Sequence, residues 1–301
     1  MASQDSAANG SGGFQADPKP LDPGLYFVAT PIGAARDITL RTLDILANSE
    51  VLVAEDTRRL RHLMEIHGVP LGSRRIIAYH DHNGEAARPA LLRHLAEGRS
   101  VAYASEAGTP LVADPGFQLA RAAIAEGRLV RAAPGPSAVL AALGVAGLPT
   151  DRFFFAGFLP AAKSARRRAL MELVDIPATL IFYESPKRIK EMLADLCEVF
   201  SDQRDAVICR ELTKRFEETI RGTLGDLRHS FDDRAPKGEF VVLVGRPVEE
   251  PADPAKLDAA LREALPGRRV KEVATEIAQR LGLPRREVYQ AALRLGEEDE
   301  N

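Results

Sequence analysis

Short apolar segments alternate with amphipathic segments through the first half of this chain, and this alternation constrains its fold most. The segments 24–30, 50–56, 75–80, 100–105 and 129–133 are rich in aliphatic, aromatic and β-branched residues. Apolar residues at helical spacing lie between them, as at Leu40, Leu43 and Leu46. Strands that are apolar throughout and separated by helices predict a parallel sheet covered on both faces. We therefore expect an α/β fold in this half of the chain.

A second unit begins near residue 151, where strand-like segments follow one another more closely. The segments 178–185, 205–212, 217–224 and 238–245 have strand composition, and their close spacing favours a mixed sheet with antiparallel pairs. The predicted organisation is a disordered tail (1–22), a first α/β domain (23–146), a second α/β domain (147–247), a proline-rich linker (248–254) and a helical segment (255–301).

Composition sets the broad class of the protein. A chain of 301 residues suits two domains rather than one core. The formal net charge of -3 means that any surface for nucleic acid must be local. Two cysteines, Cys197 and Cys209, are too few for a disulfide framework or a cysteine zinc cluster. No run of membrane-spanning length and no signal peptide is found, so we expect a cytoplasmic protein.

Four turn-rich segments each follow a predicted strand: 30–37, 54–58, 105–116 and 133–138. Ligands of open parallel sheets bind beyond the carboxyl ends of the strands, so the four segments predict a shared cleft. The alternative is four unrelated structural turns. No dinucleotide fingerprint, phosphate-binding loop or nucleophile elbow is found in the sequence. The segments offer backbone groups, small residues and carboxylates, which suit a ligand with hydroxyls, an amino group and a positive centre.

Seven blocks, in order, carry a resemblance to a known family. They include "LYFVATPIG", "AEDTRRLRHLMEIHGV", "SEAGTPLVADPG", "FYESPKRI" and "KGEFVVLV", and together they span about residues 24–246. The chain resembles the bacterial 16S rRNA 2′-O-ribose methyltransferases of the tetrapyrrole-methylase-like superfamily. The resemblance implies two α/β domains of the tetrapyrrole methylase type with S-adenosyl-L-methionine in the cleft between them. It also implies a homodimer that methylates a cytidine ribose of 16S rRNA in the small ribosomal subunit.

The resemblance assigns cofactor-binding residues to the turn-rich segments and to the second domain. Glycine at position 108 lets the backbone approach the cofactor, although glycine and proline also shape ordinary tight turns. The implied cofactor-binding residues are Pro31, Gly33, Glu106, Ala107, Gly108, Thr109, Pro110, Asp114, Pro136, Ser137, Phe182, Tyr183 and Leu212.

The chain departs from the family pattern at two places. Glu106 stands where the family usually has aspartate, which keeps the charge and lengthens the side chain by one methylene. Ala34 lacks the polar side chain expected at its position, and Arg36 replaces a small residue. The roles of these positions are therefore open.

The implied reaction is methyl transfer from a sulfonium to a ribose hydroxyl. It requires no metal, because the leaving group departs neutral, and alignment of the reacting atoms supplies much of the rate. Candidates for a base or an electrostatic helper are Glu55, Asp56, Glu184 and Lys187. For Glu55 and Asp56 the alternative role is to cap the helix that starts near Thr57. No single base is assigned.

RNA contact requires local positive charge. For each run of basic residues, the alternative to RNA contact is an ordinary solvated surface. For His80 and His82 the alternative is a polar turn. Metal binding by these two histidines would need a third ligand, and none is obvious nearby. The predicted RNA-binding residues are Arg58, His80, His82, Lys163, Arg166, Arg167, Arg168 and Arg188. Among Phe153, Phe154 and Phe155, at least two are expected in the core, because neighbouring strand residues face opposite sides.

The last segment has helical periodicity interrupted at Gly282 and Pro284, which resembles a helix-turn-helix. Arg285 and Arg286 begin its second helix, where such motifs contact nucleic acid. A helical hairpin packed on the body is the alternative.

Two other functions are compatible with the same fold. One is methylation of a tetrapyrrole carbon. The other is a non-catalytic RNA-binding assembly protein, which Pro31, Gly33, Gly108 and Pro136 argue against. The leading hypothesis remains an rRNA ribose methyltransferase.

Overall fold

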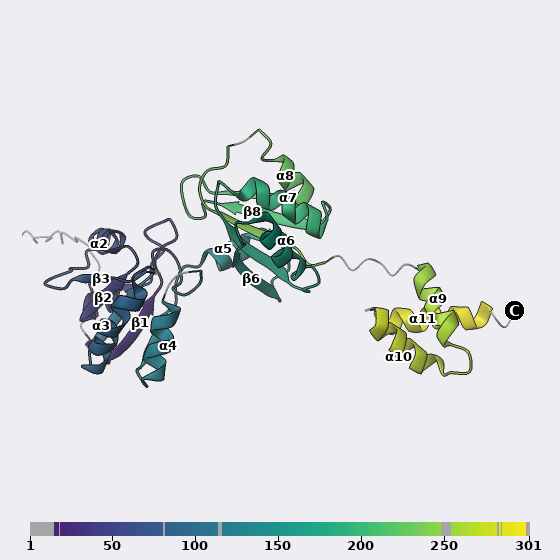
Figure 1. Cartoon of the computed structure of the whole chain (residues 1–301), viewed down its shortest axis with the longest axis horizontal. Helices are drawn as coiled ribbons and strands as arrows, with labels where there is room; N and C mark the ends of the chain where they lie inside the picture. The colour runs from purple at the N-terminus through teal and green to yellow at the C-terminus, as the bar shows by residue number, and fades with distance from the viewer. Residues whose placement is uncertain are drawn as a thin grey trace, which may run out of the picture. The chain divides into compact units, whose positions relative to one another are not determined.

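A computed structural model describes residues 15–17, 19–80, 82–113, 116–233, 235–247, 254–281, 283 and 285–298. The chain forms two compact units, and the boundary between them falls after Arg246 (Figure 1). The first unit contains both sheets, and the second contains the C-terminal helices. The two units are described separately below.

The first sheet has five strands in the order β3-β2-β4-β1-β5. Every pairing in it is parallel. Its strands are β1 (Gly24–Val28), β2 (Val51–Ala54), β3 (Ile76–Ala78), β4 (Ser100–Ala104) and β5 (Val130–Ala133). All residues of β1, β2 and β4 are buried, as expected for strands covered on both sides. The predicted parallel α/β domain is confirmed.

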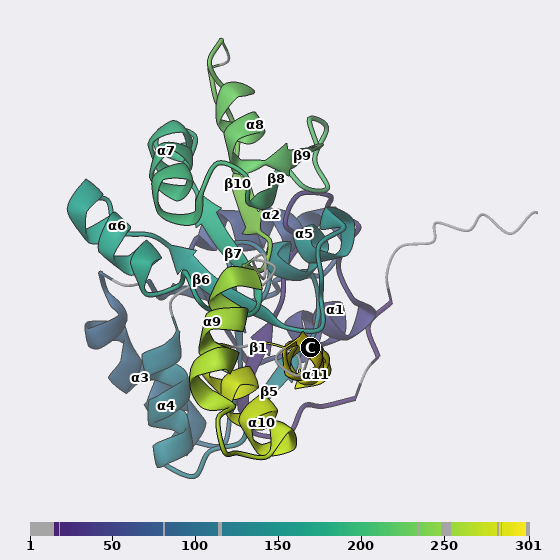
Figure 2. The same cartoon turned by 90° about the vertical axis from the view of Figure 1, so that its right-hand side faces the viewer.

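Four helices cover this sheet, two on each face (Figures 1 and 2). α1 (Leu40–Asn48) and α2 (Thr57–Ile66) pack on one face, and α3 (Gly84–Ala96) and α4 (Phe117–Ala125) pack on the other. Each helix follows a strand, so its start lies at the carboxyl edge of the sheet. At α1 the Thr39 side chain accepts a hydrogen bond of 3.1 Å from the backbone N–H of Thr42, and it therefore caps the helix.

The second sheet is mixed and has the order β6-β7-β10-β8-β9. β6 (Phe153–Phe158) pairs with β7 (Thr179–Glu184) in parallel. β8 (Asp205–Arg210), β9 (Glu218–Thr223) and β10 (Phe240–Val244) form the antiparallel pairs. α6 (Lys163–Met171), α7 (Ile189–Phe200) and α8 (Leu224–His229) pack on one face. α5 (Ala138–Ala146) packs on the opposite face.

The domain boundaries differ from the prediction in two places. α5 was assigned to the first domain, whereas its buried residues Val139, Ala142 and Leu143 pack against the second sheet. Residues 15–17 and 19–22 also differ from the predicted disordered tail, because Asp17 hydrogen-bonds Asp44 and Asn48 of α1. The remainder of that tail and residues 248–253 of the predicted linker lie outside the described residues.

The prediction that at least two of the three consecutive phenylalanines lie in the core is wrong. Phe153 and Phe154 are 44% and 42% exposed, and only Phe155 packs inward, with its ring centroid 4.8 Å from that of Tyr183. The reason is the position of β6 at the sheet edge, where it has one neighbouring strand.

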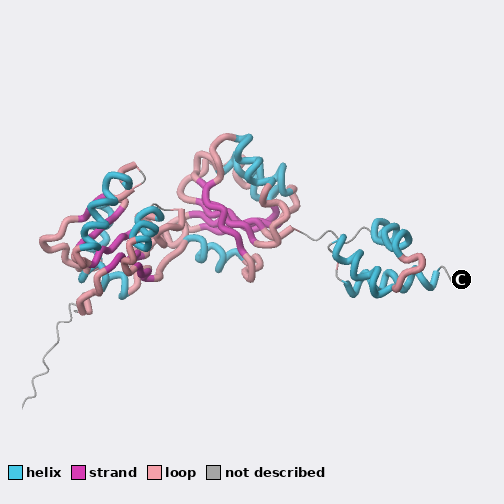
Figure 3. Tube along the Cα trace, turned by 60° about the horizontal axis from the view of Figure 1, so that its bottom comes forward, coloured by secondary structure: helices cyan, strands magenta, loops and turns pink. Residues whose placement is uncertain are grey.

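The C-terminal unit consists of α9 (Pro254–Ala264), α10 (Val270–Leu281) and α11 (Arg285–Glu298), drawn in cyan in Figure 3. Its core is small, and Leu261, Val273, Ile277 and Val288 are fully buried in it. Arg285 and Arg286 are exposed at the start of α11. Gly282 and Pro284 lie outside the described residues. Within the described chain, every helix is too short or too polar to cross a membrane.

Candidate active site

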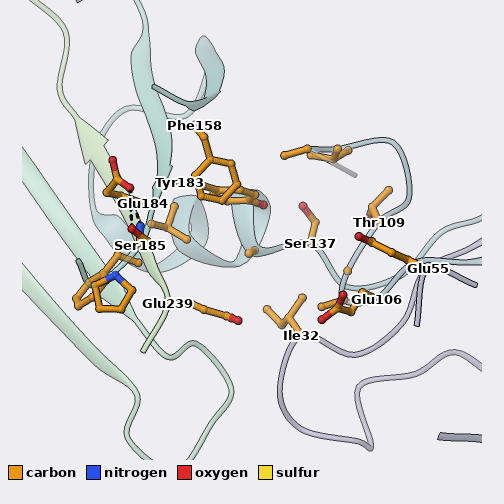
Figure 4. Close-up of a pocket in the computed structure, with 18 of the residues that line it drawn as sticks. Ile32, Glu55, Glu106, Thr109, Ser137, Phe158, Tyr183, Glu184, Ser185 and Glu239 are labelled. Atoms are coloured by element: carbon orange, nitrogen blue, oxygen red, sulfur yellow. Dashed lines mark hydrogen bonds between the residues drawn. The ribbon is translucent and has the colours of Figure 1, made fainter. Parts of the chain in front are cut away.

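The loops that follow β1, β2, β4 and β5 converge at one edge of the first sheet and line a cavity of about 420 Å³ (Figure 4). The loops contribute Ile32, Glu55, Glu106 to Thr109, and Ser137 to this cavity. The second domain closes the other side with residues that include Phe158, Tyr183 and Val241. The predicted convergence of the loops is therefore correct, and the parallel register of the strands is its cause.

Hydrogen bonds hold three of these loops together. The N–H of Thr30 donates to the carbonyl of Gly108 at 3.0 Å, and the N–H of Gly108 donates back at 2.9 Å. The hydroxyl of Thr109 donates to the carbonyl of Pro136 at 2.9 Å. The Ser105 hydroxyl also donates to the carbonyl of Gly108. The cavity floor is therefore fixed by backbone groups from segments far apart in sequence.

The loop after β4 has an unusual backbone. Gly108 has φ +78°, and Leu111 and Ala113 also adopt the left-handed region, with φ 70° and 55°. Non-glycine residues in this region are strained, and such residues concentrate at functional sites. A Cβ added to Gly108 would lie 3.2 Å from Ile32 Cγ2 and 3.5 Å from the Pro136 carbonyl oxygen. Glycine therefore allows the three loops to approach one another beside the cavity.

The loop after β1 also contacts the second domain. A Cβ on Gly33 would lie only 2.5 Å from Lys214 Cγ and 2.6 Å from Thr213 Oγ1. The N–H of Ala34 donates to Thr213 Oγ1 at 3.0 Å. Glycine at position 33 is therefore required for contact between the two domains. The departure at Ala34 is tolerated because this position contributes its backbone N–H rather than a side chain.

Carboxylates of the cavity have defined partners. Glu106 Oε1 lies 2.7 Å from Arg59 Nη1, and Glu239 Oε2 lies 2.9 Å from Lys214 Nζ. Glu184 is 2% exposed, and its Oε1 accepts a hydrogen bond of 2.7 Å from the N–H of Ser185. Glu55 also has an interaction partner. The acidic lining suits a ligand with a positive centre, as the sequence predicted.

Phe182 and Tyr183 of β7 point to opposite faces of the second sheet. Tyr183 lines the cavity, and burial raises its pKa to about 12 against the opposing effect of the Val139 backbone. Phe182 is fully buried in the core on the opposite face of the sheet. The predicted contact of Phe182 with a cofactor is therefore wrong for its side chain, because neighbouring residues of a strand face opposite sides.

Six of the thirteen residues predicted to bind a cofactor line the cavity directly. They are Glu106, Ala107, Gly108, Thr109, Ser137 and Tyr183. Six of the others are not in the lining: Pro31, Gly33, Pro110, Pro136, Phe182 and Leu212. Asp114 lies outside the described residues. Sequence reasoning missed eleven lining residues: Ile32, Arg59, Val112, Ala113, Ala138, Phe158, Ser185, Pro186, Glu239, Phe240 and Val241. All of them lie inside the seven recognised blocks, and this position is the signal that could have found them.

The four catalytic candidates occupy different environments. Glu55 and Glu184 line the cavity, whereas Lys187 is exposed and outside the lining. Asp56 caps α2, because its Oδ1 accepts hydrogen bonds of 2.8 Å and 3.3 Å from the N–H groups of Arg58 and Arg59. These bonds lower the pKa of Asp56. For Asp56 the capping role, given as the alternative, is confirmed.

Some of the basic residues predicted to bind RNA form ion pairs, and others are exposed without one. Arg166 is 1% exposed, and its Nε lies 2.6 Å from Asp195 Oδ2. Its assignment to RNA contact is therefore wrong, since the side chain joins α6 to α7. Arg167 is paired with Asp195 and Glu198. By contrast, Lys163 and Arg168 are exposed, and within the described residues neither forms an ion pair.

The histidine segment forms a polar turn. Asn83 Oδ1 accepts a hydrogen bond of 2.8 Å from the N–H of His80, and Asn83 Nδ2 donates to the Ala78 carbonyl at 3.0 Å. The rings of His80 and His82 lie 6.0 Å apart, and neither residue lines the cavity. Among the described residues, no three His, Cys, Asp or Glu side chains are grouped as metal ligands. RNA contact by these histidines and by Arg58 stays a prediction.

Comparison with known proteins agrees with this geometry. Residues 24–228 match the family model described as tetrapyrrole (corrin/porphyrin) methylases. Cobalt precorrin-4 methyltransferase superposes with a TM-score of 0.57 at 18% identity, covering 73% of this chain and 94% of that one. Diphthine synthase superposes with the same TM-score at 16% identity, covering 73% and 89%. The fold and the cavity therefore define a two-domain methylase of the tetrapyrrole methylase type.

More similar relatives specify the family further. The ribosomal RNA small subunit methyltransferase I of Mesorhizobium japonicum is 47% identical over 279 residues, covering 92% of this chain and 94% of the relative. The same protein of Escherichia coli O157:H7 is 40% identical, covering 89% and 94%. Residues 251–296 match the family model described as the RsmI C-terminal HTH domain. The chain belongs to the ribosomal RNA small subunit methyltransferase I family, and the predicted family and enzyme class are confirmed.

Proposed function

We propose that this enzyme transfers a methyl group from S-adenosyl-L-methionine to the ribose 2′-hydroxyl of a cytidine in 16S rRNA. The observation that carries the proposal is the cavity of about 420 Å³ in a chain that is 47% identical to a ribosomal RNA small subunit methyltransferase. Its volume is in the range of small-molecule sites.

The residues of the cavity fit the cofactor. S-adenosyl-L-methionine supplies an electrophilic methyl group on a positively charged sulfur. Gly108 has no side chain, so its backbone is accessible to such a ligand, whereas a larger residue would fill the space beside it. The same side carries two carboxylates, Glu55 and Glu106, and one guanidinium, that of Arg59, so acidic groups outnumber basic ones there. Ser137 precedes the first turn of α5, where the positive end of the helix dipole favours a carboxylate.

The enzyme's own contribution is chiefly alignment. The carboxylates Glu55, Glu106, Glu184 and Glu239 each have a partner. We therefore assign no general base among them. With the cofactor bound, the hydroxyl proton would pass to water as the O–C bond forms and the S–C bond breaks. Loops fixed by the bonds between Thr30 and Gly108 hold the reacting groups in line without a cost of reorganisation.

The experiment that tests the proposal is mapping of 2′-O-methyl marks on 16S rRNA. Small ribosomal subunits that lack the mark are incubated with the protein and labelled S-adenosyl-L-methionine. We expect one methyl group per subunit at a cytidine 2′-oxygen. A tetrapyrrole substrate methylated in place of RNA, or an absence of cofactor binding in calorimetry, would refute the proposal.

The homodimer and the cytoplasmic location are further parts of this proposal. Both come from the family resemblance, supported by a relative that is 47% identical over most of this chain. Light scattering of the purified protein tests the dimer. A molecular mass near that of one chain, 32.7 kDa, at micromolar concentration would contradict it.

A further inference from the structure

Phe158 is a large apolar side chain that remains half exposed at the cavity. It is 55% exposed and lies in the lining, beside Tyr183 in Figure 4. The pairing of β6 with β7 shifts between Phe155 and Gly157, which marks a β-bulge. Gly157 has φ +68° in this bulge. Bulges re-aim side chains next to active sites, and this one precedes the residue that faces the cavity.

Two neighbours hold Phe158 in place. Its ring packs edge-on against Tyr183, with centroids 5.6 Å apart, and Tyr183 packs in the same way against Phe155. The backbone that follows is fixed by Arg188, whose Nη2 donates to the carbonyl of Leu159 at 2.7 Å. An aromatic ring that is rigid on one side and open on the other is a stacking surface for a planar group.

Two lysines lie close in the sequence to residues that line the cavity. Lys163 begins α6 five residues after Phe158, and Lys187 follows the lining residues Ser185 and Pro186. Both lysines are exposed, and over the described chain neither has an ion-pair partner. The second-domain wall also carries two carboxylates, Glu184 and Glu239, but each is paired, with Arg188 and with Lys214. Phosphates therefore fit at the two unpaired lysines of this wall.

Resting on the function proposed above, we infer that Phe158 stacks on the target base of the RNA, with Lys163 and Lys187 contacting the flanking phosphates. Proteins that recognise single-stranded RNA stack unpaired bases on aromatic side chains, and a base stacked on Phe158 brings its ribose to the cavity. The cofactor's adenine is the competing planar group. We favour the RNA base because the cofactor carries no phosphate for the two lysines.

A double-mutant cycle on the full-length protein tests this inference. Two 16S rRNA fragments are compared, one with cytidine at the target position and one with an abasic ribose there. For the unmodified protein we expect loss of the base to weaken binding about ten-fold, the magnitude typical of one stacked base. For Phe158→Ala we expect both fragments to bind equally, because the partner of the base is gone.

Controls separate stacking from other causes. Phe158→Trp should retain the preference for the cytidine fragment, and Phe158→Leu, which keeps apolar volume without a ring, should lose it. Phe153→Ala removes an exposed ring of the same strand outside the cavity and should change nothing. Melting temperatures and the affinity for S-adenosyl-L-methionine should stay close to those of the unmodified protein in all four variants.

Two results would overturn the inference. Additive losses in the cycle would show that Phe158 and the base do not interact. A ten-fold or greater loss of affinity for S-adenosyl-L-methionine in Phe158→Ala would assign the ring to adenine. Failure of the proposed function is distinguishable, because the unmodified protein would then leave the cytidine fragment unmethylated.

Discussion

Gly108 is the residue at which three loops of the active site meet. Its backbone exchanges two hydrogen bonds with Thr30, and the carbonyl of Pro136 lies 3.5 Å from the place of a Cβ. The left-handed φ of +78° is accessible to glycine at no steric cost and is costly for other residues. Position 108 therefore combines a conformational requirement with a spatial one.

We expect Gly108→Val to abolish measurable binding of S-adenosyl-L-methionine in calorimetry. The branched side chain strains the backbone and fills the approach to the cavity. Gly98→Val is the matched control, because Gly98 has nearly the same φ, +77°, and a Cβ there meets nothing within 4 Å. That variant should retain its cofactor affinity. Unchanged affinity in Gly108→Val would rule out close backbone approach.

Tyr183 is a titratable residue of the cavity, and its pKa lies above the ordinary value for tyrosine. Burial raises its pKa to about 12, so the phenol stays neutral throughout the physiological range. The folded-state pKa lies above the unfolded value, about 10. The contribution of neutral Tyr183 to the free energy of unfolding is therefore fully present below pH 10 and is lost as the pH rises through about 12.

We expect an ultraviolet titration to show this directly. The titration of the unmodified protein should contain a tyrosine transition near pH 12, and this transition should be missing in Tyr183→Phe. The unfolding free energy of the unmodified protein should fall between pH 10 and 12 more steeply than that of Tyr183→Phe. A transition near pH 10 that disappears in this variant would contradict the buried environment.

At the scale of single elements, α6 is held to α7 by a buried charge cluster. Arg166 of α6 and Asp195 of α7 have side chains that are 2% and 1% exposed, and Arg167 lies 2.7 Å from the other oxygen of Asp195. The two arginines lower the pKa of Asp195 against the opposing effect of its desolvation. The pair fixes the helix that carries Lys163 and Arg168 on its exposed side.

Removing one partner of a buried ion pair leaves the other charge uncompensated. We expect Arg166→Ala to lower the unfolding free energy by about 3–5 kcal/mol in a urea titration. Arg168→Ala, two residues further and exposed, should change it by less than about 0.5 kcal/mol. Equal stability of the two variants would mean that the cluster does not join the helices.

At the scale of the whole molecule, positive charge is concentrated locally in a protein whose formal net charge is -3. Lys163, Arg168 and Lys187 of the second domain are exposed, whereas Arg166, Arg167 and Arg188 are engaged in ion pairs. The number of basic residues in the sequence therefore overstates the positive charge that is available to RNA. The exposed side chains of Lys163, Arg168 and Lys187 are therefore the ones to test for RNA contact.

We expect the triple change of Lys163, Arg168 and Lys187 to glutamine to weaken RNA binding and to flatten its salt dependence. For single-stranded RNA, each lost phosphate contact lowers the slope of log K against log salt by about 0.7, so three contacts lower it by about 2. The control changes Arg41, Arg75 and Arg121 to glutamine, which are exposed and outside the cavity. If both triple variants give the same slope, RNA does not contact the region beside Phe158.

Much of this protein was determined by the sequence itself. Alternating apolar strands and helices fix a parallel sheet, because only strands covered on both faces are apolar throughout. A parallel sheet brings all loops at its carboxyl edge together, so the cleft around Gly108 can be predicted from the sequence. The recognised blocks add the family, and the departures at Ala34 and Glu106 are accommodated by a backbone N–H and by a pair with Arg59.

Only the tertiary structure decided which side of each element faces the cavity. On β7, Tyr183 lines the cavity and Phe182 lies in the core, a difference of one residue that depends on which face α5 covers. On α6, Arg166 and Arg168 differ in burial because α7 packs on one side. Phe158 reaches the cavity through a bulge in β6. Such choices depend on contacts between distant segments, and local sequence patterns carry no information about those contacts.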